Sequence, residues 1–139
     1  MTTELDLLIL KEIITIYEVN HSTQKGLIIT KYEQEKKTFF KKKSPHEAFA
    51  NSKPVQAWKY HDFNLEDVKL DDESIQTQFT GNLYETYVYT TARFIYKEKE
   101  KTVYLDTVFG PLFGRGWRFP VVEKDDKLAL ATPSIIWMS

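Results

Sequence analysis

The chain has 139 residues, of which 42% are hydrophobic, 28% charged and 14% aromatic, and its net charge is −1. The length predicts one domain over residues 1–139 with a core of its own. The near-neutral charge gives no global field that would recruit nucleic acid. Because there is no cysteine, disulfides, thiolate catalysis and cysteine-based metal sites are excluded.

The N-terminal segment, "MTTELDLLILKEIITIYEV", does not have the pattern of a signal peptide, because it lacks a basic start and acidic residues interrupt its apolar run. No stretch of about 18 consecutive apolar residues is present to form a transmembrane helix. The sequence therefore predicts a soluble, cytoplasmic protein.

Residues 3–19 carry signals for both helix and strand. Thr3 and Asp6 have the spacing of a capping box, whereas "EIITIYEV" is rich in β-branched residues. The prediction is a helix over residues 3–10 that runs into a first strand, and one continuous helix to Val19 is the alternative.

After residue 26, apolar and polar residues alternate in short runs separated by turn signals. The pattern predicts eight or nine strands in an up-and-down antiparallel meander that closes into a small barrel or a strongly curved half-barrel. The fold class is thus all-β, or α+β with a short N-terminal helix acting as a lid or plug. The predicted strands cover residues 27–33, 36–43, 55–63, 74–79, 83–97, 102–109, 115–122 and 128–138.

The C-terminal segment "DKLALATPSIIWMS" resembles the closing strands of the lipocalin-like, or calycin, group of small β-barrels. This resemblance covers the back half of the chain and implies a cup for a lipid, pigment or other amphipathic molecule. A second resemblance is to the cone fold of the nuclear-transport-factor-2-like proteins, in which an N-terminal helix packs on a curved sheet. It implies a binding pocket or a small active site.

The chain has only three arginines, and Arg93 lies in the most apolar predicted strand, between Ala92 and Phe94. Pairing across the 97–101 hairpin places it opposite Leu105 and next to Asp106, so an ion pair with Asp106 is expected. Two interpretations remain open: a structural ion pair on the outer face, or an arginine in a cavity that grips an acidic ligand.

Aromatic side chains supply the rest of the predicted ligand site, because tyrosine and tryptophan form apolar walls with hydrogen-bonding tips. They are equally good strand residues. The predicted ligand-binding residues are Arg93, Arg118, Tyr87, Tyr89, Tyr104, Trp58 and Trp117.

Catalytic and metal signals are weak. The histidines have no ligand-like spacing, so no metal site and no cofactor are predicted. His61, on a predicted strand, and Asp106 are the weak candidates for a general base.

The run "KKTFFKKK" has two interpretations: an edge strand whose lysines block sheet-to-sheet pairing, or a contact surface for an anion or a protein partner through Lys41, Lys42 and Lys43.

The stretch "FGPLFGRGWRFP" (109–120) is not a phosphate-binding loop, since it lacks the Lys-Ser/Thr pair and a following helix. It predicts that Pro111 ends a strand, that Gly114 and Gly116 allow a turn or bulge, and that Pro120 marks an edge, bulge or strand end. The predicted function is binding of a small amphipathic ligand without catalysis. The alternatives are a cone-fold enzyme and a protein–protein adaptor or assembly factor.

Overall fold

A computed structural model describes residues 2–20, 26–35, 48–72, 75, 90–110 and 113–138. Helix α1 spans Glu4–Asn20. Its start is the expected capping box: the Thr3 amide donates to Asp6 Oδ2 and the Asp6 amide donates to Thr3 Oγ1, both at 3.0 Å. Lys31 adds an ion pair to the same Asp6 oxygen at 3.0 Å and fastens this end of the helix to the sheet.

The helix continues through the segment that was predicted to become a strand after residue 10, so that prediction is wrong and the continuous alternative is correct. Ile9, Ile13 and Tyr17 recur at four-residue spacing and are buried together with Leu10. Burial of this apolar face against the sheet outweighs the modest preference of isoleucine and threonine for strands.

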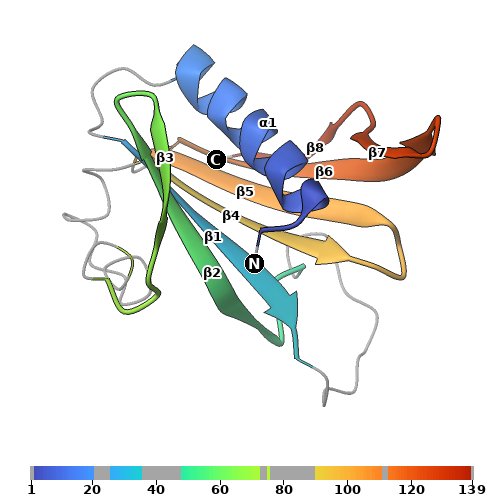
Figure 1. Cartoon of the computed structure of the whole chain (residues 1–139), viewed down its shortest axis with the longest axis horizontal. Coiled ribbons are helices and arrows are strands. Elements are labelled where there is room, and N and C mark those ends of the chain that lie inside the picture. The colour runs from blue at the N-terminus through green and yellow to red at the C-terminus, as the bar shows by residue number, and fades with distance from the viewer. Residues whose placement is uncertain are drawn as a thin grey trace.

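The described strands form one sheet in the order β3-β2-β1-β4-β5-β6-β7, with β8 paired to β6 (Figure 1). Their bounds are β1 Leu27–Gln34, β2 Ser52–His61, β3 Asn64–Val68, β4 Thr90–Lys97, β5 Thr102–Gly110, β6 Phe113–Lys124, β7 Lys127–Leu130 and β8 Ser134–Met138. The predicted closing strand over residues 128–138 is divided into β7 and β8, because residues 131–133 leave the ladder.

The fold is the predicted β-rich class with an N-terminal helix, but the meander differs in two respects. β1 and β4 pair in parallel, whereas only antiparallel pairs were expected. The described strands form an open sheet with edges at β3 and at β7 and β8, not a closed barrel. β2 and β4 pair with the two sides of β1, whereas the predicted hairpin partner of β1 was the segment 36–43. That segment, strand 74–79 apart from Ile75, and residues 83–89 lie outside the described residues.

The main core lies between α1 and one face of the sheet. Trp58 on β2 and Phe94 on β4 stack beneath the helix, with ring centroids 6.0 Å apart. Tyr17 of the helix meets Tyr60 edge-on at 6.0 Å. The buried sheet residues of this core are Leu27, Ile29, Trp58, Tyr60, Ala92, Phe94, Val103, Leu105, Phe119 and Val121. This face is filled by side chains.

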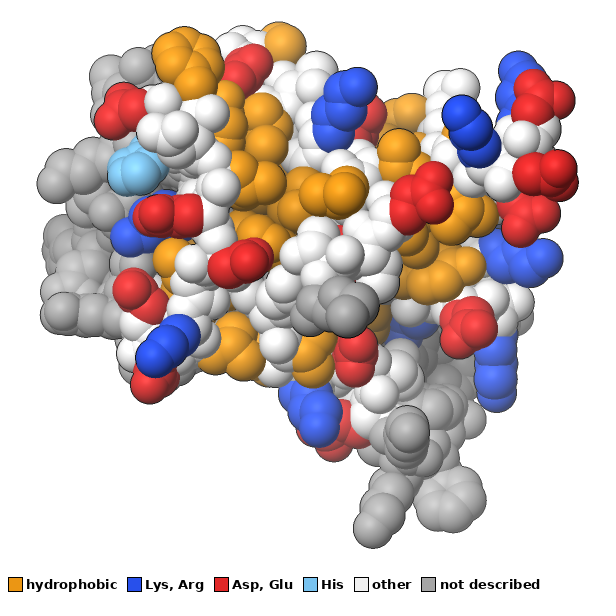
Figure 2. Space-filling view, in the orientation of Figure 1, with side chains coloured by type: hydrophobic (Ala, Val, Ile, Leu, Met, Phe, Trp, Pro, Cys, Tyr) orange, Lys and Arg blue, Asp and Glu red, His pale blue; other side chains and the backbone are white. Residues whose placement is uncertain are grey.

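The helix does not cover all of this face. Hydrophobic side chains remain visible beside α1 and toward β6 and β7, between charged groups (Figure 2). Ile135 and Met138, which lie on β8 opposite Trp117 and Arg115, are exposed. Apolar side chains therefore also reach solvent on the edge strand β8.

Candidate functional site

Arg93 and Asp106 pair directly across β4 and β5. Arg93 Nη2 lies 2.9 Å and Nε 3.0 Å from Asp106 Oδ2. The expected ion pair is confirmed, although the register differs by one residue from the prediction that placed Arg93 opposite Leu105. The Arg93 side chain lies on the face away from α1, because the flanking residues Ala92 and Phe94 belong to the core beneath the helix and successive side chains of a strand point to opposite faces. Asp106 lies on the same face, because it pairs directly with Arg93.

The pair is half open to solvent: the Arg93 side chain is 42% exposed and the Asp106 side chain 13% exposed. Solvent screening limits the contribution of such a pair to about 1 kcal/mol or less. Its main effect is geometric, because Asp106 fixes the orientation of the guanidinium.

Trp137 forms a hydrogen bond with the other oxygen of Asp106. Its indole Nε1 donates to Asp106 Oδ1 at 3.0 Å, from β8 across the whole width of β6. The register explains how it reaches: Asp106 pairs with Gly116, and Gly116 pairs with Trp137. A Cβ atom at residue 116 would lie 1.9 Å from Trp137 Nε1. Only glycine at this position leaves room for the indole.

This contact gives the glycine-rich stretch its structural role. Gly114 and Gly116 lie inside β6, so neither forms a turn, but each lies beside an irregularity of the kind predicted as a bulge: the register with β5 shifts next to Gly114 and the register with β8 shifts next to Gly116. Pro120 lies where β6 passes from pairing with β8 to pairing with β7, consistent with the predicted interruption. Pro111 lies outside the described residues.

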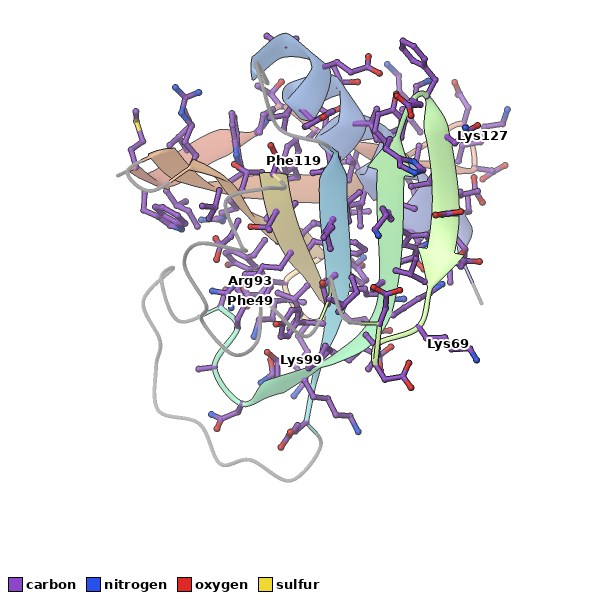
Figure 3. All side chains as sticks on the ribbon, turned by 90° about the vertical axis from the view of Figure 1, so that its left-hand side faces the viewer. Phe49, Lys69, Arg93, Lys99, Phe119 and Lys127 are labelled. Atoms are coloured by element: carbon purple, nitrogen blue, oxygen red, sulfur yellow. The ribbon has the colours of Figure 1, made fainter. Side chains whose placement is uncertain are left out.

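Aromatic rings support Arg93 from the other side. The guanidinium carbon lies 4.0 Å from the centroid of the Phe49 ring and 5.8 Å from that of Tyr32, and these two rings meet edge-on at 5.3 Å. A cation over an aromatic face at a partly exposed site contributes roughly 0.5–1 kcal/mol. Figure 3 shows Arg93 beside Phe49, away from the helix-covered side that carries Phe119. We call Tyr32, Phe49, Arg93, Asp106 and Trp137 the Arg93 cluster.

Tyr104 and Arg118 extend this cluster on the same face. They are opposite each other on β5 and β6, and Tyr104 packs against Phe49 and Ile95. The Tyr104 hydroxyl donates to Glu100 Oε1 at 2.7 Å. Burial, followed by this hydrogen bond, raises the pKa of Tyr104 to about 12. Tyr104 is therefore a neutral hydrogen-bonding group near neutral pH, and Arg118 is an exposed cation beside it.

Thr30 borders Arg93 on the neighbouring strand β1. The residue is fully buried, and no residue in the described part of the chain forms a hydrogen bond with its hydroxyl. A buried hydroxyl without a partner is uncommon in native proteins.

The predicted ligand-lining residues do not form one cup. Arg93, Tyr104 and Arg118 lie on the face away from α1, whereas Trp58 and Trp117 pack on the helix-covered side. Trp58 is buried in the core, and the Trp117 indole donates to Thr107 Oγ1 at 3.3 Å. The remaining predicted contacts, Tyr87, Tyr89, Lys41, Lys42 and Lys43, lie outside the described residues.

The two candidates for a general base lie far apart in the sheet. His61 ends β2, and two strands, β1 and β4, separate β2 from β5, which carries Asp106. Three strand spacings amount to roughly 14 Å. His61 Nδ1 is buried, and among the described residues none forms a hydrogen bond with it.

Sequence reasoning missed Tyr32, Phe49 and Trp137. A glycine in mid-strand indicates close approach of another group, so Gly116 was the available signal for Trp137. Phe49 carried no such signal, because its contact depends on where residues 48–50 lie against the sheet. Within the described ranges, no three His, Asp or Glu side chains are placed to hold a metal ion. In the same ranges, no helix is long and apolar enough to cross a membrane.

Comparison with known proteins gives no relative: no family model, no curated protein and no solved structure matches this chain.

Proposed function

We propose that this protein binds a small amphipathic molecule carrying an acidic group, without catalysing a reaction, and that Arg93 contacts that group. The observation that carries the proposal is an arginine that is held in place yet still accessible. Asp106 and Phe49 fix the guanidinium, while 42% of the side chain stays exposed.

Donor counting supports this assignment. A guanidinium has five N–H donors, and Asp106 takes one from Nε and one from Nη2. The donors that do not face Asp106 suit a carboxylate, sulfonate or phosphate oxygen. Tyr32 and Ile136, half-buried beside Phe49, offer an apolar surface for the body of the same molecule. Arg118 supplies a second cation on this face.

The state of Asp106 favours binding over catalysis. Arg93 occupies one of its oxygens and Trp137 the other. Both carboxylate oxygens are thus engaged by donors of the protein, whereas a general base must direct an oxygen at a substrate proton. The cone-fold enzyme with Asp106 as general base is accordingly the weaker proposal.

Two fluorescent probes that differ in one charged group test the proposal. 8-Anilinonaphthalene-1-sulfonate has a sulfonate, and N-phenyl-1-naphthylamine is its uncharged counterpart. We expect the sulfonate to bind more tightly, and Arg93→Gln to weaken its binding about tenfold or more, as for a lost hydrogen bond to a charged group. Binding of the uncharged probe should stay within twofold.

Arg115→Gln is the matched control, because Arg115 lies on β6 but on the opposite face of the sheet from Asp106. Near-ultraviolet circular dichroism of the tryptophans monitors the fold of each variant. Equal affinities for the two probes, or an equal loss in the two arginine variants, would contradict the proposal.

A further inference from the structure

The two edges of the sheet differ in how they are protected. An exposed edge strand offers unpaired N–H and C=O groups, and proteins commonly block such edges with charged residues. β3 follows this rule, since its "NLEDV" sequence places the exposed Glu66 and Asp67 at the edge. A second copy of β3 placed alongside would meet like charges.

β8 has no charged side chain to block pairing at its edge. Residues 131–138, "ATPSIIWM", contain no charged side chain. β8 pairs with β6 on one side, and no other described strand pairs with its outer side. Ile135 is 48% exposed and Met138 is also exposed. Pro133 limits the accessible stretch to residues 134–138, because proline has no N–H to donate.

We infer that β8 is a self-association edge, at which two copies of this chain pair their β8 strands antiparallel about a two-fold axis. Charge favours this occupant. An uncharged edge can face its own copy without repulsion, whereas the acidic β3 edge cannot. In a two-fold contact the same patch serves both partners, so the exposed isoleucine and methionine of each copy cover the other.

The length of the edge limits the strength of the dimer. Five residues per copy bury much less than the roughly 1,600 Å² of a standard stable interface. We therefore expect a reversible dimer with a dissociation constant in the micromolar range. Ile135 of one copy lies opposite Met138 of the other if the axis passes between Ile136 and Trp137, beside the extra residue Ile136 that interrupts the register with β6.

Sedimentation velocity over a hundredfold range of concentration tests the inference with two matched variants. Ile135→Lys places a charge on the edge strand, and we expect it to weaken the dimer at least tenfold. Val122→Lys is the control: Val122 is similarly exposed, at 42%, but it pairs with Ala129 of β7 and lies outside the part of β6 that pairs with β8. It should leave the dimer intact.

A cysteine scan makes the test independent of stability. The natural chain has no cysteine, so any disulfide reports an introduced one. Under mild oxidation, single cysteines at residues 134 to 138 should give a cross-linked dimer at the position nearest the axis. Leu65→Cys, on the β3 edge, should not. The inference is overturned by a wild-type chain that stays monomeric, by equal effects of the two lysine variants, or by equal cross-linking at residue 65.

Discussion

The face of the sheet under α1 is filled by large apolar side chains, whereas the opposite face carries an ion pair, an indole donor and aromatic rings over a cation. The first arrangement gains free energy from area removed from water. The second gains little from its partly exposed ion pair but holds polar groups in fixed directions. The comparison teaches that the helix-covered face holds the large apolar core, whereas the opposite face combines smaller buried apolar clusters with oriented polar groups.

The largest expected effect lies on the helix-covered face. Phe94→Ala removes a ring stacked on Trp58 and leaves a cavity, so we expect the free energy of unfolding to fall by about 3–5 kcal/mol. Ile95→Ala, the next residue on the same strand but on the opposite face, should cost roughly 2–3 kcal/mol, because it removes a smaller side chain and the partly buried Tyr32 and Ile136 can move toward the space. Urea denaturation measures both. A larger loss at Ile95 would break the contrast between the faces.

A smaller effect is expected at the Arg93 cluster. Gly116→Ala puts a methyl group into the Trp137 indole, and we expect a loss of about 1–3 kcal/mol from overpacking. The loss of the indole donor to Asp106 should appear as a change in the near-ultraviolet circular dichroism of Trp137. Trp137→Phe in the Gly116→Ala background separates the two effects, since removing the indole nitrogen should restore part of the stability. No restoration would mean that the strain lies in the backbone of β6.

The smallest effect is an alkaline loss of stability shared by the two faces. A hydrogen bond to Glu18 of α1, followed by burial, raises the pKa of Tyr60 to about 12. Burial, followed by the hydrogen bond to Glu100, raises the pKa of Tyr104 to about 12 as well. The ordinary value is 10.0, so the folded state binds these protons more tightly than the unfolded state. The stabilisation is complete below pH 10 and is lost as the pH rises toward 12.

Unfolding of Tyr60→Phe and Tyr104→Phe between pH 9 and 12 measures this effect on each face separately. Each variant should have a shallower decline than the wild type. If only Tyr104→Phe changes the slope, the alkaline response belongs to the face that carries the Arg93 cluster alone.

The sequence predicted much of the sheet because its signal is local. Alternation of buried and exposed residues placed β4 and β5 in their hairpin and Arg93 beside Asp106. The prediction of a strand over residues 11–19 failed, because burial of the helix against the sheet outweighs the strand preference of isoleucine. The sequence could not predict Phe49 over Arg93 or Trp137 on Asp106, because those contacts join segments that are distant in the chain.

The parallel ladder between β1 and β4 has a consequence for how the chain is assembled. Among the described strands, the other ladders are antiparallel and join strands one or two places apart in chain order, so the sheet consists of two groups, β1–β3 and β4–β8, joined by this one parallel ladder. The entropy of closing a long loop is concentrated there. Tyr32 belongs to the first meander and Arg93 to the second. The Arg93 cluster therefore contains residues from both groups of strands and forms only after β1 and β4 have paired.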